Sequence, residues 1–279
     1  MISRSLFFIF AYIPMMLIGI PVQFVVTRLG LDWNFMPRLF HKFGCVFLGL
    51  RVKVIGEPAH GRPTLLLSNH ISWTDIIAIG SVADVTFVAK SSVRDWFFVG
   101  FMASLQKTIY VDYTRRRDTH RTNKEMASRL AGNGAVLLFA EGHRDLGDHV
   151  QPFRSALVGA AQAAMAEGGA KDVAVQPVTI AYTRLQGLPV SRTERSGISG
   201  INARGFTQVV SNLLSSGMKD VTIAFGAPMP LSAKADRKVV TRQAEEEVRR
   251  TLVALNRSLP LPPVAGAVSD TPGTKPLAA

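Results

Sequence analysis

Residues 65–75 read Leu-Leu-Leu-Ser-Asn-His-Ile-Ser-Trp-Thr-Asp, and the change from apolar to polar residues within this stretch decides the fold. The run Thr64–Leu67 is short and apolar and follows Gly-Arg-Pro, which predicts a buried strand. Ser72-Trp73-Thr74-Asp75 has the Ser-x-x-acid pattern of a helix start, and an apolar segment follows it. We therefore expect His70 where a strand leaves the core, just before a helix begins.

The spacing of His70 and Asp75 suggests a catalytic pair. On one continuous helix, side chains five positions apart diverge by about 140° and would not meet. A turn between them brings the carboxylate to the imidazole, where it would fix the tautomer and stabilise the protonated ring. A structural interpretation stays open, with Asp75 as the acid of a capping box and His70 as a satisfied histidine at a strand end. The same interval separates His143 and Asp148, so spacing alone does not decide.

The composition narrows the class of protein. The chain has 279 residues, enough for one large domain or two small ones, and it carries a net charge of +12. Such a charge indicates an anionic partner: nucleic acid, an acidic membrane surface or an acidic substrate. The sequence has no zinc-finger spacing, RNP-like strand or long basic helix, which disfavours nucleic acid. Cys45 is the single cysteine, which excludes an intrachain disulfide, and its apolar surroundings indicate a packing role.

Residues 1–50 are predicted to anchor the chain to a membrane. No charged residue occurs from Ser5 to Thr27, a run long enough to span a bilayer, although Pro14 and Pro21 leave a kinked or interfacial helix open. The segment Asn34–Leu50 combines an apolar face with a basic edge, which suits a helix lying on an anionic bilayer. A core-packed helix is the alternative. Most positive charge lies beyond Arg28, so the positive-inside rule places the main body on the cytoplasmic side.

Residues 51–257 are predicted to form an α/β domain, because strand-like and helix-like segments alternate. This pattern indicates a mixed, largely parallel sheet flanked by helices. The expected strands are Arg51–Gly56, Thr64–Leu67, Val85–Ala89, Thr108–Val111, Ala135–Ala140, Val173–Ile180 and Val221–Phe225. The expected helices are Asp75–Val82, Trp96–Leu105, Arg117–Leu130, Phe153–Ala166 and Ala235–Leu255. Ser191–Ile201 is predicted to be a loop, and residues 258–279 a disordered tail.

A second apolar run, Ala135–Ala140, also stops at polar groups, which read Glu141-Gly142-His143-Arg144-Asp145. Open α/β sheets bind ligands at the carboxyl ends of their strands, so we expect this stretch at the same edge as His70. Gly142 permits a close backbone approach, and Arg144 offers a planar set of donors suited to phosphate. A surface arginine and a helix-cap or salt-bridge role for Glu141 are the structural alternatives. The histidines and acids of residues 143–149 crowd one short loop, so no metal is predicted.

Together with Val175-Gln176-Pro177-Val178, these stretches make the chain resemble the glycerolipid acyltransferase family of the PlsC type. The pattern runs from about Arg38 to Gly226, with its blocks in the order of the family. The resemblance implies a glycerol-3-phosphate acyltransferase-like fold with an N-terminal membrane-associated segment. It also implies an inner-membrane enzyme that moves a fatty acyl group from acyl-CoA or acyl carrier protein to the hydroxyl of a lysolipid, without a further cofactor.

The resemblance also implies roles for individual residues. His70 would be the general base and Asp75 its orienting acid. The implied acceptor-binding residues are Glu141, Gly142, Arg144 and Pro177. The sequence contains no Gly-x-Ser-x-Gly elbow, so we expect direct transfer without an acyl-enzyme, and backbone N–H groups near the helix start after Ser72 to stabilise the oxyanion.

Two departures from the family concern the acceptor. Tyr113 stands where the family usually has arginine, which moves the expected phosphate contact to Arg115 or Arg116, and His143 replaces a usual threonine. The first expectation for the acceptor is 1-acyl-sn-glycerol-3-phosphate, giving phosphatidic acid. Short segments such as Ala181-Tyr182-Thr183 resemble an alphaproteobacterial branch of the family that includes acyltransferases of lyso-ornithine lipid. Lyso-ornithine lipid is therefore the alternative acceptor. A non-catalytic membrane-binding protein is the distant alternative.

Overall fold

The computed structural model describes residues 6–31, 34–111, 124–130, 134–156, 158–159, 162, 172–203, 206–232 and 235–262. A sheet with the strand order β1-β8-β6-β2-β5-β3-β4 forms its centre, and β7 and β9 each pair with β6. The strands are β1 (Leu50–Ile55), β2 (Thr64–Ser68), β3 (Val85–Lys90), β4 (Ile109–Val111), β5 (Ala135–Phe139), β6 (Asp172–Leu185), β7 (Leu188–Pro189), β8 (Lys219–Phe225) and β9 (Met229–Ser232). Neighbours from β6 to β4 along this order are parallel, whereas β6 and β8 are antiparallel. The predicted mixed, largely parallel sheet is therefore confirmed.

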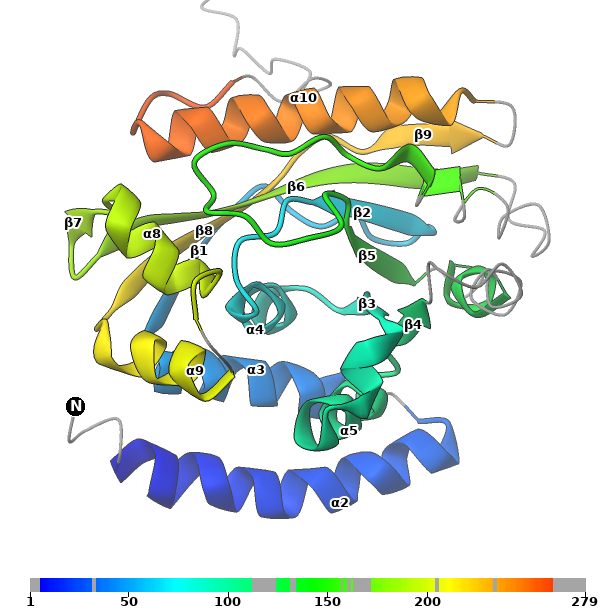
Figure 1. Ribbon diagram of the computed structural model, residues 1–279. Helices are drawn as coiled ribbons and strands as arrows, with labels where there is room; N and C mark the ends of the chain where they lie inside the picture. Colours follow the sequence, from blue (N-terminus) through cyan, green and yellow to red (C-terminus); the bar gives the residue numbers. More distant parts are fainter. Residues whose placement is uncertain are drawn as a thin grey trace, which may run out of the picture.

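Helices cover both faces of this sheet (Figure 1). They are α2 (Ile13–Leu29), α3 (Phe35–Leu48), α4 (Thr74–Val82), α5 (Phe97–Leu105), α8 (Arg192–Ser199), α9 (Phe206–Ser215) and α10 (Arg237–Asn256). The long helix α10 lies along one face, α3 and α4 lie on the other, and α2 lies beyond α3 (Figure 1). Sheet and helices thus form the layers of an α/β fold.

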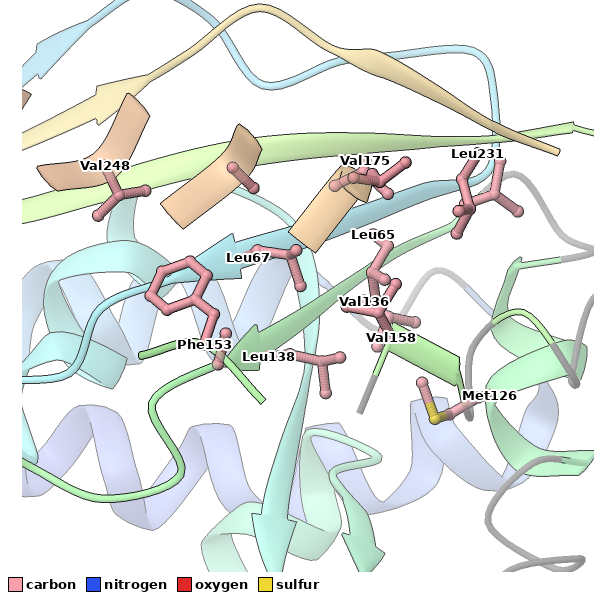
Figure 2. Close-up of a cluster of buried hydrophobic side chains, with 14 of the residues drawn as sticks. Leu65, Leu67, Met126, Val136, Leu138, Phe153, Val158, Val175, Leu231 and Val248 are labelled. Atoms are coloured by element: carbon pink, nitrogen blue, oxygen red, sulfur yellow. The ribbon is translucent and has the colours of Figure 1, made fainter. Parts of the chain in front are cut away.

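The core has one hydrophobic cluster on each face of the sheet. Leu65 and Leu67 belong to the cluster on the α10 side, which Figure 2 shows together with Phe153 and Val248, whereas Leu66 belongs to the cluster on the α4 side. Strand β2 is therefore buried on both faces, which explains why it reads as an uninterrupted apolar run. This strand ends at Ser68, two residues before His70.

Helix α8 corrects the prediction of a loop at Ser191–Ile201. Ser191 accepts a hydrogen bond from the N–H of Glu194, and the Glu194 side chain accepts one from the N–H of Ser191, so a complete capping box starts the helix. The sequence contains this Ser-x-x-Glu signal, but the segment lacks a long apolar stripe and therefore resembles a loop. Helix α9 and strands β7 and β9 were not predicted either.

The other predicted elements agree within a few residues where the structure describes them. The expected helices at 117–130 and 153–166 are described only in part; residues 124–130, 155–156, 158–159 and 162 are helical. The predicted tail is described as far as residue 262, and the remainder of that prediction lies outside the described residues.

The N-terminal segment forms a helix from Phe8 to Leu29 that is long and apolar enough to cross a membrane, with a mean hydropathy of 2.1. It is largely uncovered by the rest of the chain. Pro21 lies inside α2 without ending it. The prediction of an uncharged, helical N-terminal segment therefore agrees with the structure in length and composition.

Helix α3 contacts protein on two of its sides. Its residues His41, Cys45 and Leu48 are buried, and the helix packs against α4. On another side Phe47 stacks on Phe8 at a ring-centroid distance of 4.3 Å. Protein covers these two sides, whereas Phe35 and Val46 are exposed, so the expected contact of this helix with a bilayer stays a prediction.

Candidate active site

His70 and Asp75 meet as predicted, because the chain turns between the end of β2 and the start of α4. The Nδ1 atom of His70 lies 2.8 Å from Oδ2 of Asp75. The same oxygen accepts hydrogen bonds from the backbone N–H groups of Ile71 (2.7 Å) and Ser72 (2.9 Å). Asp75 therefore does what both interpretations proposed: it reaches back to the chain before the helix, and it contacts the imidazole.

These contacts define the tautomer of His70. An ionised carboxylate can only accept, so Nδ1 donates its proton to Asp75 and Nε2 keeps a lone pair. The ring of Phe139 stacks on the imidazole at 3.9 Å between centroids and 17° between planes. The His70 side chain is 16% exposed and Asp75 is fully buried, so the histidine alone is open to a substrate. The arrangement can accept a proton from a bound hydroxyl.

Two further residues complete the support of this pair, and sequence reasoning gave neither a role. The amide of Asn69 exchanges two hydrogen bonds with the backbone of Ile180, at 3.0 and 2.9 Å, and so ties the end of β2 to β6. The hydroxyl of Tyr182 donates to Oδ1 of Asp75 at 2.8 Å. The signal for Tyr182 in the sequence was a polar aromatic residue within a buried-type strand, whereas Asn69 directly precedes His70.

The stretch after β5 lies against His70, as expected for strands that end at one edge. The backbone N–H of His70 donates to Oε2 of Glu141 at 2.7 Å, and the N–H of Asp145 donates to the carbonyl of His70 at 2.9 Å. Oε1 of Glu141 accepts from the N–H of Gln151 at 2.8 Å. Both oxygens of Glu141 thus accept hydrogen bonds from backbone N–H groups, and this buried carboxyl connects two loops at the site.

Burial raises the pKa of Glu141 to about 7, although the two N–H donors from His70 and Gln151 act to lower it. Its ordinary value is 4.5. Between these values the folded protein binds more protons than the unfolded chain, so the free energy of unfolding should fall as pH rises through this range.

We expect the wild type to lose on the order of 1–3 kcal/mol between pH 4.5 and 7 through Glu141, and the Glu141→Gln variant to lack this loss. Denaturant unfolding in mild detergent at a series of pH values would measure it. Replacing the exposed Glu246 with Gln serves as the control. Parallel stability–pH curves for the wild type and Glu141→Gln would contradict the assignment.

The other predicted acceptor-binding residues described by the structure are Gly142, Arg144 and Pro177. Gly142 has φ +75°, a backbone conformation that favours glycine, and a Cβ there would lie 2.7 Å from Nε of Arg154. Arg144 is partly buried and donates to the carbonyl of Ser199 at the end of α8, at 3.2 Å. Pro177 is buried in β6, where it is paired with Leu67 of β2, and it lines a pocket together with residues of α10.

Three expectations remain predictions. Arg115 and Arg116 lie outside the described residues. The side-chain atoms of Asp145, Asp148 and His149 that could bind a metal lie within 4.8 Å of one another. The imidazole of His149 pairs with Asp148 at 2.6 Å, and the expected absence of a metal stays a prediction. Backbone N–H groups near the helix start remain candidate oxyanion donors.

The described part of the chain has a sheet edge with an imidazole, a buried carboxylate bonded to it and a nearby arginine, which suits an enzyme of group transfer. Comparison with known proteins agrees with this class. A family model named Acyltransferase matches residues 51–181. A lyso-ornithine lipid O-acyltransferase of Brucella abortus is 40% identical over 90% of this chain and 95% of its own length. A protein of the same name from Rhizobium meliloti is 36% identical over 85% of this chain and 81% of its own length.

More distant relatives include a 1-acyl-sn-glycerol-3-phosphate acyltransferase of Neisseria gonorrhoeae, 27% identical over 70% of this chain and 72% of its own length. The crystal structure of the PlsC acyltransferase from Thermotoga maritima has the same fold, with a TM-score of 0.62 at 20% identity, over 91% of this chain and 95% of that one. The chain belongs to the acyltransferase family, and it is an acyltransferase enzyme.

Proposed function

We propose that this enzyme transfers a fatty acyl group from an acyl thioester to the free hydroxyl of a lyso-ornithine lipid. The contact between His70 and Asp75 carries the chemistry of the proposal. The relatives from Brucella and Rhizobium support the acceptor, because they bear this name and align over most of both chains. The sequence analysis put 1-acyl-sn-glycerol-3-phosphate first, and the relatives favour its alternative.

In the proposed reaction, Nε2 of His70 takes the proton of the acceptor hydroxyl as the oxygen attacks the thioester carbonyl. The carbon–sulfur bond then breaks, the thiolate leaves, and the imidazolium returns the proton to it. The products are an ester and a free thiol, and no acyl-enzyme forms. General-base assistance of this kind is worth roughly 10²–10⁴ in rate.

Arg144 is the proposed contact for the acceptor's anionic group. Ornithine carries a carboxylate, and a guanidinium binds carboxylate with the same paired donors that it uses for phosphate. Only one hydrogen bond of this guanidinium, from Nη1 to the Ser199 carbonyl, is defined in the described part of the chain. Arginine has five N–H donors, which leaves donors for a ligand.

The proposed location follows from the N-terminal helix and the charge. The helix from Phe8 to Leu29 would anchor the enzyme in the inner membrane, with the main body on the cytoplasmic side against an anionic surface. There it would meet both the lysolipid and a soluble acyl donor, acyl-CoA or acyl carrier protein.

The test compares acceptors with one purified preparation of the full chain in detergent. We expect kcat/KM for lyso-ornithine lipid to exceed that for 1-acyl-sn-glycerol-3-phosphate by about 10-fold or more, measured by mass spectrometry of the products with each donor type. The reverse preference would mean that the acceptor is 1-acyl-sn-glycerol-3-phosphate. Liposome binding without release of thiol from any donor would instead support the non-catalytic alternative.

A further inference from the structure

The hydroxyl of Tyr182 closes a chain of hydrogen bonds behind the His70–Asp75 pair. It lies 2.8 Å from Oδ1 of Asp75 and 2.6 Å from Oγ1 of Thr74, and the tyrosine is 1% exposed. A carboxylate can only accept, so the single phenolic proton goes to Asp75 and the Thr74 hydroxyl donates to the phenol oxygen. The donors therefore run from Thr74 through Tyr182 to the carboxylate that faces His70.

We infer that Tyr182 is a positioning residue for acyl transfer: its hydroxyl fixes the orientation of Asp75 and sets how strongly that carboxylate favours the protonated ring of His70. The inference deepens the proposed function and rests on it, because it requires His70 to be the base.

The two oxygens of Asp75 are held in different ways. Oδ2 accepts from His70 and from the two backbone N–H groups before α4, whereas the Tyr182 hydroxyl is the partner defined for Oδ1 within the described residues. Burial and the nearby carboxylate hold the pKa of Tyr182 well above its ordinary value, so the phenol stays protonated and remains a donor. In a buried site, each hydrogen bond that a carboxylate accepts stabilises its negative charge strongly, and so weakens its attraction for a neighbouring proton.

The titratable groups that face this assembly come from three directions. His70 contacts Asp75 directly. The Cys45 thiol of α3 interacts electrostatically with Tyr182, and the Glu141 carboxyl interacts electrostatically with Asp75. Burial raises the pKa of Cys45 to about 11, so it is neutral through the working range. Glu141 is present equally in the wild type and in the variants below, so a difference between them reports on the tyrosine hydroxyl.

The first test is Tyr182→Phe in the full-length enzyme. We expect kcat to fall about 10-fold, with KM for both substrates within about 2-fold of the wild type, because the lost group acts on the base and does not touch substrate. In the pH profile of kcat/KM, the acidic limb should move to a pH about half a unit higher. Without the tyrosine hydroxyl, the carboxylate of Asp75 has one hydrogen-bond donor fewer and favours the protonated imidazole more strongly. Tyr110→Phe is the matched control. It removes another buried hydroxyl, which donates to the Gly100 carbonyl, and should leave the limb in place.

The main readout of the second test uses the wild-type sequence, so it does not depend on the folding of a variant. The chain has four tyrosines, and global replacement by 3-fluorotyrosine makes each hydroxyl a stronger donor. The acidic limb should then move to lower pH in the wild-type background and stay in place in the Tyr182→Phe background. An unmoved limb in fluorotyrosine-labelled wild type, or a Tyr182→Phe limb that coincides with that of the wild type, would overturn the inference. The proposed function would survive that result and would fail separately, through an active His70→Ala enzyme.

Discussion

Replacing His70 with alanine is expected to reduce acyl transfer by about 10²–10⁴-fold while leaving the fold intact. The imidazole is the one group of the pair that reaches solvent, and its Nε2 has the lone pair that the reaction needs. Alanine keeps the backbone N–H that binds Glu141 and the carbonyl that binds Asp145. The loops of the site should therefore remain joined.

The measurement is thiol release and ester formation by purified His70→Ala enzyme, together with its melting temperature. His60→Ala is the control, since His60 is exposed in the loop between β1 and β2. We expect the control to retain wild-type activity and both variants to melt within about 2 °C of the wild type. Activity of His70→Ala within a few-fold of the wild type would refute the assignment of the base.

The His70–Asp75 pair could be predicted because its causes are local. A buried strand, a turn and a helix start lie within the stretch 65–75, and each has a signal in neighbouring residues. The position of the second stretch followed from a general rule for parallel strands. The role of Glu141 did not, because its partners are backbone N–H groups, which no residue type reveals.

Contacts between distant segments were beyond sequence reasoning. Tyr182 is 107 residues from Asp75, and its side chain reaches the carboxylate only because β6 lies beside β2. Helix α8 is positioned in the same way. Its Arg195 donates to the Gly147 carbonyl and to Asn256 of α10, at 3.0 Å each, so the helix is pinned to the loop that follows Arg144. Polar segments that are stabilised by such contacts resemble loops in a single sequence.

Asp75→Asn should give an equally large loss of acyl transfer, about 10²–10⁴-fold, but with a loss of stability that His70→Ala does not cause. An amide has one acceptor oxygen, whereas the carboxylate accepts from four groups through two oxygens. If the amide oxygen takes the place of Oδ2, the NH₂ group faces the donor hydroxyl of Tyr182. If the amide is turned over, the NH₂ group faces Nδ1 of His70 and the wrong tautomer is favoured.

In either orientation a buried donor loses its acceptor, at a cost of about 1–3 kcal/mol, so the melting temperature should fall by several degrees. Asp84→Asn is the matched control, because Asp84 is 42% exposed in its ion pair with Arg38. The double variant of His70→Ala and Asp75→Asn should be no less active than the poorer single variant, since the two residues act as one unit. Multiplied losses in the double variant would mean that Asp75 serves catalysis by a route that does not pass through His70.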